Sequence, residues 1–257
     1  MNDTGIRRVA DALLHARAER RPACAAACAD ALASADDAYR VQARVARALG
    51  WFDGEPARHW KSGGPSRDAV LTHAPLPAAG VWASPAVPPA GWPLAWRGIE
   101  AEIALRLGRD VDAATAARLD GASAAAWVDA MAVSIELVES RWAEGMAAPA
   151  LLRLADLQSH GALVLGAWRP FAARDWSGQA CRVAIGARPA VERRGSHALD
   201  SPTWGLAAWL RHATRDGARL PAGTVVTTGT WVGVLEAEEG DLVQAEFDGI
   251  GAATLQL

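Results

Sequence analysis

The sequence predicts a mixed α+β fold with a helical N-terminal segment. Apolar residues recur at helical spacing in residues 1–50, and residues 98–110 alternate between apolar and polar side chains. Residues 221–257 are typical of strands joined by glycine turns. A chain of 257 residues can bury a sizeable core, and no internal repeat or low-complexity linker divides it. We therefore expect one domain over residues 1–257, with its mixed β core at residues 51–257.

Two helices are expected in the N-terminal segment. Their inward faces are Ile6, Val9, Ala10, Leu13 and Leu14 in the first helix, and Val41, Val45 and Leu49 in the second. Ser34 or Asp36 can cap the start of the second helix, and Gly50 can end it. Residues 22–35 superficially resemble a signal peptide, but the stretch is weakly apolar and Asp30 interrupts it, so we expect none there.

Strands and single helices are expected to alternate along the rest of the chain. In order they are loops and short strands at 51–97, a strand at 98–110, an alanine-rich helix at 112–131 ending near Met131, strands at 132–142 and 161–166, a helix at 202–215 and strands at 221–257. This order is typical of a mixed α+β core.

The composition excludes several classes of function. Lys and Arg number 26 and Asp and Glu number 29, so the net charge of −3 offers no basic surface for nucleic acid or an anionic membrane. No stretch reaches the roughly 18 apolar residues of a membrane span. Three cysteines cannot form a disulfide framework, so we expect a cytoplasmic protein. Phosphate-loop, dinucleotide-binding, HExxH and GxSxG motifs are absent from the sequence.

Lysine is almost absent from this arginine-rich chain. The one lysine, Lys61, stands against 25 arginines (26 − 1). Arginine is planar and permanently charged, whereas lysine is a compact donor whose pKa can be lowered. Lys61 is therefore either a chance survivor on the surface or a residue that arginine cannot replace, and the composition alone leaves both interpretations open.

Three glutamates on two predicted strands form the candidate chemical centre. Glu100 and Glu102 are two positions apart, so their side chains point to the same face of one strand. Glu136 lies between apolar neighbours on the next strand, where a buried carboxylate needs a partner. Together they offer hard oxygen ligands that suit Mg²⁺ or Mn²⁺ and the chelating oxygens of a 2-keto acid. The alternative is a solvated face of an edge strand.

The sequence resembles the 2-keto-4-pentenoate hydratase and 4-oxalocrotonate decarboxylase branch of the fumarylacetoacetate hydrolase superfamily. The segments that carry the resemblance, in the family's order, are DDAYRVQ (36–42), WKSGG (60–64), GIEAEIALRLGRD (98–110), SIELVESR (134–141), LADLQSHGALVLG (154–166), LPAGTVVTTGTW (220–231) and the terminal GDLVQAEFDGIGAATLQL. Single segments are weak signals, whereas their order, the paired glutamates and the only lysine are strong ones.

This resemblance implies a mixed β-roll-like fold, a Mg²⁺ or Mn²⁺ cofactor, small 2-keto or 2-hydroxydienoic acid substrates and a homo-oligomer. By the same resemblance, Glu100, Glu102 and Glu136 are metal ligands, Lys61 contacts the substrate and assists proton transfer, and Asp156 holds its loop or relays a proton. Ser159 and Thr230 are placed near the substrate.

The departures from the family pattern bear on the reaction. The family's Asn is Leu157 here, and its Asp in D-S-R is Glu139. Glu136 as third ligand, without a following R-D-x-Q motif, favours a hydratase-like lyase acting through a metal-bound enolate. Decarboxylation or C–C hydrolysis of a 2-keto acid on the same site is the alternative. A non-catalytic ligand-binding protein of the same fold is a further hypothesis, for which Leu157 is the best argument and Lys61 the best counter-argument.

Overall fold

The computed structural model describes residues 3–257. Its helices are α1 (Asp3–Glu19), α2 (Ala35–Ala48), α3 (Ala113–Arg118), α4 (Gly121–Ala125), α5 (Ala150–Ala155) and α6 (Leu206–Ala213). Its strands are β1 (His59–Gly63), β2 (Thr72–Leu76), β3 (Val81–Ala83), β4 (Gly98–Leu107), β5 (Val128–Val138), β6 (His160–Leu165), β7 (Arg169–Pro170), β8 (Ala180–Ile185), β9 (Val191–Arg194), β10 (Val225–Thr227), β11 (Leu235–Glu236), β12 (Leu242–Phe247) and β13 (Gly251–Gln256). No helix of this described part is long and apolar enough to cross a membrane.

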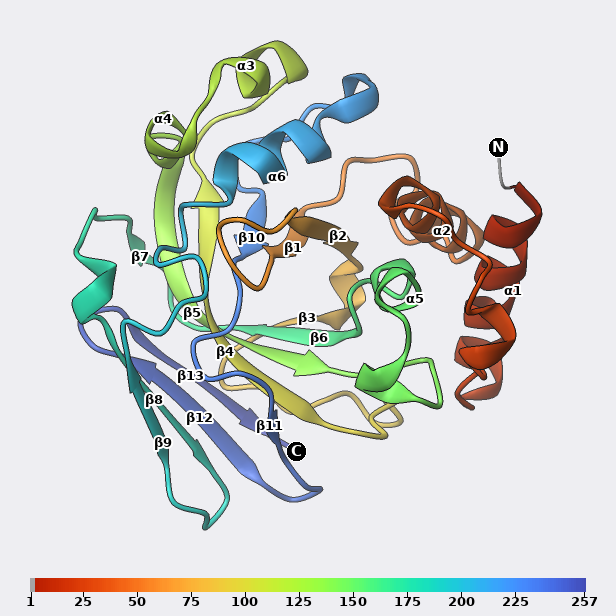
Figure 1. Cartoon of the computed structure of the whole chain (residues 1–257). Helices are drawn as coiled ribbons and strands as arrows, with labels where there is room; N and C mark the ends of the chain where they lie inside the picture. The colour runs from red at the N-terminus through yellow and green to blue at the C-terminus, as the bar shows by residue number, and fades with distance from the viewer. Residues whose placement is uncertain (1–2) are drawn as a thin grey trace.

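A curled mixed sheet forms the body of the molecule (Figure 1). Its strand order is β2-β1-β10-β4-β5-β6-β3, with β11 beside β4 and β7 beside β5. The long strands β4 and β5 pair antiparallel at its centre, while β1 runs parallel to β10 and β3 parallel to β6. This architecture confirms the expected α+β fold class.

One face of the curled sheet is covered by a second, smaller sheet of order β13-β12-β8-β9. Every second residue of β4 and β5 points toward it, including Ile99, Ile103 and Ile135, and all three are fully buried. Phe247 of β12 and Leu255 of β13 belong to the same apolar core. Because neighbouring strand residues point to opposite faces, the residues between these apolar ones are directed to the other, concave face.

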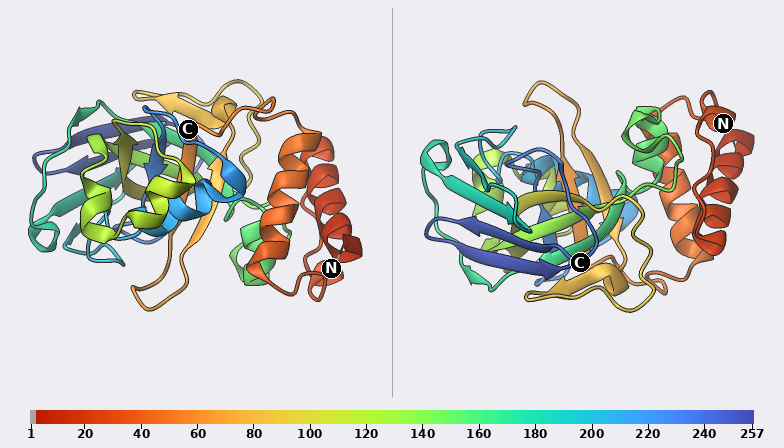
Figure 2. Two further views of the ribbon diagram at one scale, coloured as in Figure 1. Left: turned by 90° about the horizontal axis from the view of Figure 1, so that it is seen from above. Right: turned by 90° about the horizontal axis from the view of Figure 1, so that it is seen from below.

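The N-terminal helices form a lobe beside the sheet (Figure 2). α1, α2 and α5 share a separate apolar cluster that includes Leu13, Val41 and Trp142. Ser34 caps α2 as expected, because its side chain accepts a hydrogen bond from the Asp37 backbone N–H at 3.2 Å. The expectation that Leu49 faces inward is wrong: it follows the last turn of α2 and is 42% exposed.

The predicted helix at 112–131 is also wrong in its second half. α3 ends at Arg118, Asp120 caps the separate helix α4 through a capping box with Ser123, and β5 already begins at Val128. The alanines around Met131 favour a helix locally, but their pairing with β4 and their burial between the two sheets outweigh that preference.

Candidate metal and substrate site

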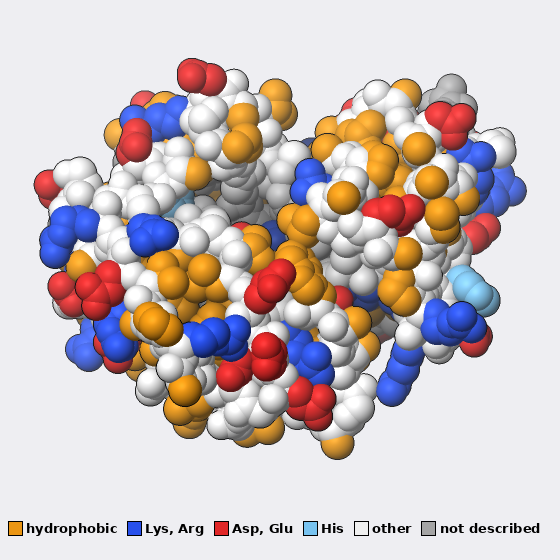
Figure 3. Space-filling view, turned by 60° about the horizontal axis from the view of Figure 1, so that its bottom comes forward, with side chains coloured by type: hydrophobic (Ala, Val, Ile, Leu, Met, Phe, Trp, Pro, Cys, Tyr) orange, Lys and Arg blue, Asp and Glu red, His pale blue; other side chains and the backbone are white. Residues whose placement is uncertain are grey.

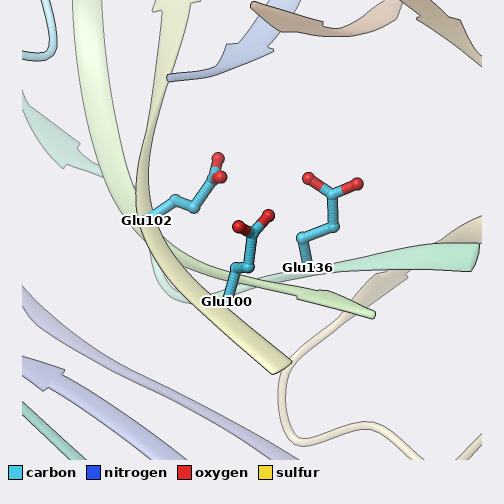
Figure 4. A group of neighbouring side chains, drawn as sticks. All are labelled: Glu100, Glu102 and Glu136. Carbon is cyan, nitrogen blue, oxygen red and sulfur yellow. The ribbon is translucent and has the colours of Figure 1, made fainter. Parts of the chain in front are cut away.

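Three carboxylates meet on the concave face of the sheet (Figure 4). Glu100 and Glu102 come from β4, and Glu136 lies directly across from Glu100 on β5. One oxygen of each lies within 4.8 Å of the other two. Glu102 is 2% exposed and Glu136 is 0% exposed, and β4 is a central strand. The alternative of a solvated edge strand is therefore wrong.

Lys61 reaches the three carboxylates from β1, a strand that would lie far from β5 if the sheet were flat. β1 and β5 are separated by β10 and β4, which corresponds to roughly 14 Å at the usual strand spacing. The sheet curls, and the Lys61 Nζ lies 2.5 Å from the Glu136 Oε1. The Lys61 side chain is only 12% exposed, so the interpretation of this residue as a chance surface survivor is wrong.

Glu136 has one oxygen that is paired and one that is free. Its Oε1 contacts the Lys61 Nζ and lies 3.0 Å from the His160 Nδ1. Its Oε2 is buried and has no hydrogen-bond partner within the described residues. A buried carboxylate oxygen without a partner is costly, and a cation between the three carboxylates would remove that cost.

Burial and mutual repulsion perturb the pKa values of these carboxyl groups. Burial, then the charges of Glu102 and Glu136, raises the pKa of Glu100 to about 8. Burial and the charge of Glu136 raise the pKa of Glu102 to about 7. Burial also acts to raise the pKa of Glu136, but the Lys61 ammonium and the contact with His160 together outweigh it and hold that pKa below the usual value.

The pKa of Lys61 moves in the direction that keeps it protonated. Burial acts to lower it, but the charges of Glu136, Glu100 and Glu102 together outweigh burial and raise the pKa above its usual value. Lys61 is thus an ammonium group that partly compensates three carboxylates.

Two hydroxyl groups orient Glu102. The Thr227 hydroxyl on β10 donates to the Glu102 Oε2, and the Ser134 hydroxyl on β5 lies 2.9 Å from the Thr227 hydroxyl. All three side chains are buried. This chain of hydrogen bonds fixes the direction of the carboxylate, as outer hydrogen-bond partners do in metal sites.

A strained turn presents further polar groups to the site. Leu157, Gln158 and Ser159 have φ angles of 52°, 56° and 59°, a left-handed conformation that costs a non-glycine residue about 1 kcal/mol or more. The turn aims the Gln158 carbonyl at the Lys61 Nζ, 3.2 Å away. The Ser159 hydroxyl is buried and has no hydrogen-bond partner among the described residues. Leu157, which replaces the asparagine of the family pattern, thus lies in a turn with three successive left-handed residues.

These groups line a cavity of about 640 Å³ between the sheet and the helical lobe. In the space-filling view a cleft separates the two parts (Figure 3). Lys61, Glu100, Ser159 and Thr230 all lie in its wall, which brings together most of the expected site residues. The Thr230 hydroxyl donates its hydrogen bond to the Gly233 carbonyl of the same loop at 2.9 Å, so this proton is not directed at a substrate.

Asp156 lies outside this cavity wall. Its carboxylate receives the Arg141 backbone N–H at 2.9 Å and the Arg141 Nε at 2.6 Å, and an Arg17 Nη lies 3.2 Å away. These contacts hold the turn at 157–159 against the helical lobe. The other departure, Glu139, accepts the backbone N–H groups of residues 95, 96 and 140, and so ties a loop to the end of β5.

Sequence reasoning missed four polar residues of the site: Ser134, Thr227, His160 and Arg153. Ser134 was within reach, because it precedes Glu136 by two positions and must share its face. Thr227 and His160 depend on which strands become neighbours. Arg153 on α5 lines the cavity, its Nε is buried without a partner, and it forms no ion pair within residues 3–257.

Comparison with known proteins identifies the family. Residues 53–257 match the family described as fumarylacetoacetate (FAA) hydrolase C-terminal. The chain belongs to this family. It is 33% identical over 156 residues to 2-keto-4-pentenoate hydratase 1 of Dechloromonas aromatica (strain RCB), which covers 60% of this chain and 57% of that protein. The chain therefore matches little more than half the length of this curated relative.

Solved structures of other proteins share the fold. 4-Oxalocrotonate decarboxylase from Pseudomonas putida G7, complexed with magnesium and adipate, superposes with a TM-score of 0.83 at 18% identity. That match covers 100% of this chain and 98% of the decarboxylase. Fumarylpyruvate hydrolase from Pseudomonas aeruginosa, in complex with Mn²⁺ and pyruvate, matches with a TM-score of 0.55 at 16% identity, over 78% of this chain and 89% of that one.

Proposed function

We propose that this protein is a divalent-metal-dependent hydro-lyase that adds water to a small 2-hydroxydienoic (2-keto-enoic) acid. The observation that carries the proposal is the buried group of Glu100, Glu102 and Glu136, with the free Glu136 oxygen and the Lys61 ammonium beside it. The hydratase from D. aromatica supports hydration as the reaction. We also propose that the chain works as one domain and as a homo-oligomer in the cytoplasm, where its three free cysteines stay thiols.

The residues present fit Mg²⁺ or Mn²⁺. All three donors are carboxylates, the ligand type that both ions prefer. Three ionised carboxylates and one ammonium leave two negative charges, which a divalent cation neutralises. Glu100, Glu102 and Glu136 would hold the ion, and when bound it would act as a Lewis acid on the carboxylate and 2-oxo oxygens of the substrate.

The chain's own residues position the substrate and move its protons. The Lys61 Nζ, fixed by Glu136 and by the Gln158 carbonyl, directs its remaining donor at negative charge that develops on the substrate oxygen. The free Ser159 hydroxyl can donate to the substrate or carry the added water. The apolar wall formed by Leu151 and Leu154 of α5 limits the access of other water to the cavity.

Decarboxylation of a 2-keto diacid is the second candidate, and Arg153 favours it. This guanidinium lies in the cavity wall and has no carboxylate partner among residues 3–257, and arginine pairs well with a carboxylate through two hydrogen bonds. A substrate with a second carboxylate would fill that position. Arg153→Met would then weaken the binding of diacids that are long enough to reach Arg153 from the metal site, but not of oxalate, whose two adjacent carboxylates both lie at the metal. A hydratase of monoacids would tolerate the change.

The first experiment is a titration with oxalate, a mimic of the pyruvate enolate, in the presence and absence of Mg²⁺ or Mn²⁺. Tryptophan fluorescence reports binding in the wild type and in Glu102→Gln. We expect oxalate to bind only with metal and only when Glu102 is present. Absence of metal-coupled binding in the wild type would contradict the proposal and favour a non-catalytic ligand-binding protein.

A second experiment separates chemistry from binding. Lys61→Arg keeps a positive charge, but a planar guanidinium cannot replace the compact ammonium between Glu136 and the Gln158 carbonyl. We expect this variant to fold, to retain metal binding and to lose most turnover of 2-hydroxydienoic acids. Full turnover would remove Lys61 from the mechanism. Product analysis by NMR distinguishes a hydrated product from loss of CO₂.

A further inference from the structure

A second cavity, of about 600 Å³, lies behind the segment that lines the proposed active site. Gln158 and Ser159 line the first cavity, whereas their neighbours Leu157 and His160 line the second. The second cavity is bounded by the end of α1, the segment at 91–95 and the end of β5. The proposed reaction makes no use of it.

Positive charge collects around this second cavity. Arg17, Arg20, Arg21 and Arg141 line it, and the one acidic residue in its wall is Glu139. The carboxylate of Glu139 is already occupied by backbone N–H groups. The cavity wall therefore carries more positive charge than its own residues neutralise.

The two inner arginines share one carboxylate. Arg17 and Arg141 both contact Asp156, at 3.2 Å and 2.6 Å. Burial, followed by repulsion from Arg141, lowers the pKa of Arg17 to about 10. The Arg17 Nε is buried without a hydrogen-bond partner in the described chain.

The two outer arginines have no acidic partner. Arg20 and Arg21 take part in no ion pair in the part of the chain that the structure describes, so two positive charges are in surplus at the mouth. Arg20 has a left-handed backbone with φ of 52°. Its guanidinium lies close to Gly91 in the cavity wall: a Cβ atom placed on Gly91 would be 3.7 Å from an Arg20 nitrogen. The backbone thus directs Arg20 toward the cavity.

The walls between the arginines are flat and apolar. Trp51 lies under the Arg17 guanidinium at 5.0 Å, and Trp92 packs edge-on against Trp82 with ring centroids 5.1 Å apart. Proline and leucine side chains complete the lining. Tryptophan faces and guanidinium planes are the groups on which an aromatic ring stacks.

We propose that this cavity is a second ligand site, which binds a small aromatic dicarboxylate. Arg20 and Arg21 supply the two charges that a dianion needs, and the tryptophan walls accept its ring. The cavity can hold a single-ring acid of this kind without any contact to the metal-ligand carboxylates.

Phthalate binding, measured by isothermal titration calorimetry, tests the proposal. We expect one saturable site per chain, no binding of the neutral phthalamide, and weaker binding at higher salt. The double variant Arg20→Met/Arg21→Met should bind phthalate about tenfold more weakly, because it removes both surplus charges. The matched control is Arg7→Met/Arg8→Met on α1, the helix that ends just before Arg20. These arginines already pair with Asp3 and Asp30, so their replacement should not affect the affinity.

Competition locates the site. Phthalate should bind equally well with saturating Mg²⁺ and oxalate present, and equally well to Glu102→Gln. Displacement by oxalate would place phthalate in the first cavity and overturn the proposal. Absence of saturable binding at millimolar phthalate, or equal loss of affinity in both double variants, would overturn it as well.

Discussion

Replacing Lys61 by Met should destabilise the metal-free protein strongly. The substitution keeps the apolar stem but removes the cation that lies 2.5 Å from the Glu136 Oε1. Glu136 is 0% exposed and cannot turn to solvent. Removing one partner of a buried ion pair typically costs about 3–5 kcal/mol, because the other charge stays buried and unpaired.

A second estimate gives the same magnitude. Without Lys61, the protein can relieve the repulsion by protonating Glu136, whose ordinary pKa is 4.5. At about pH 7.5, protonation of such a group costs about 4 kcal/mol, at 1.36 kcal/mol per pH unit. For a chain of this size, about 4 kcal/mol corresponds to a fall in Tm of roughly 8–16 °C.

Thermal unfolding followed by circular dichroism, in EDTA and then in excess Mg²⁺, measures both effects. Mg²⁺ should raise the Tm of Lys61→Met by more than that of the wild type, because the ion supplies the missing positive charge. The matched control is Arg219→Met, which removes an exposed ion pair to Asp110 and should cost less than about 1 kcal/mol. A Tm of Lys61→Met within about 2 °C of the wild type in EDTA would refute this reasoning.

Three further predictions follow from single contacts. Thr227→Val removes the hydroxyl that orients Glu102 and should lower Mg²⁺ affinity about tenfold by calorimetry, and an unchanged affinity would contradict this. In EDTA the variant should also lose about 1–3 kcal/mol of stability, because buried Glu102 and Ser134 lose a hydrogen-bond partner. Burial lowers the pKa of His73 from 6.5 to about 3, so its contribution to stability is complete above pH 6.5 and is lost as the pH falls toward 3. Burial lowers the pKa values of His197 and His212 as well, so urea unfolding should show a larger total loss of stability between pH 6.5 and 4.5, of which His73 supplies about 2–3 kcal/mol. His73→Gln should reduce the loss by that amount, and an equal loss in the variant would exclude His73 as a cause. Ser34→Ala should cost about 1 kcal/mol by the same assay, because the cap of α2 is lost, and an unchanged midpoint would contradict this.

Local sequence patterns predicted much of the fold and the three carboxylates of the site, whereas Asp156, Ser159 and Thr230 were expected only from the family resemblance. Strict alternation predicted that Glu100 and Glu102 share a face, and the apolar neighbours of Glu136 predicted that its carboxylate points away from them. Both expectations hold, since all three carboxylates lie on the concave face. The helical spacing in the first 50 residues likewise predicted α1 and α2.

Features that depend on tertiary pairing could not be read in this way. Alanine-rich residues 128–132 favour a helix until β4 is available as a neighbour, so the start of β5 was missed. His160 and Arg153 carry no local signal, because they reach Glu136 and the cavity only through the packing of β6 and α5. The exposed Leu49 shows the converse error, in which helical periodicity was extended past the point where the helix leaves the core.

The position of Lys61 explains why a chain so rich in arginine retains one lysine. Its ammonium lies between the Glu136 carboxylate at 2.5 Å and the Gln158 carbonyl at 3.2 Å, two acceptors from different strands and turns. An ammonium donates tetrahedrally from one atom, whereas a guanidinium donates in a plane from three nitrogens and is longer. The curl of the sheet brings the Lys61 side chain to Glu136, where a single ammonium nitrogen reaches both acceptors. A single ammonium compensates one carboxylate, so two negative charges remain when all three glutamates are ionised, and these charges are what a divalent cation would neutralise.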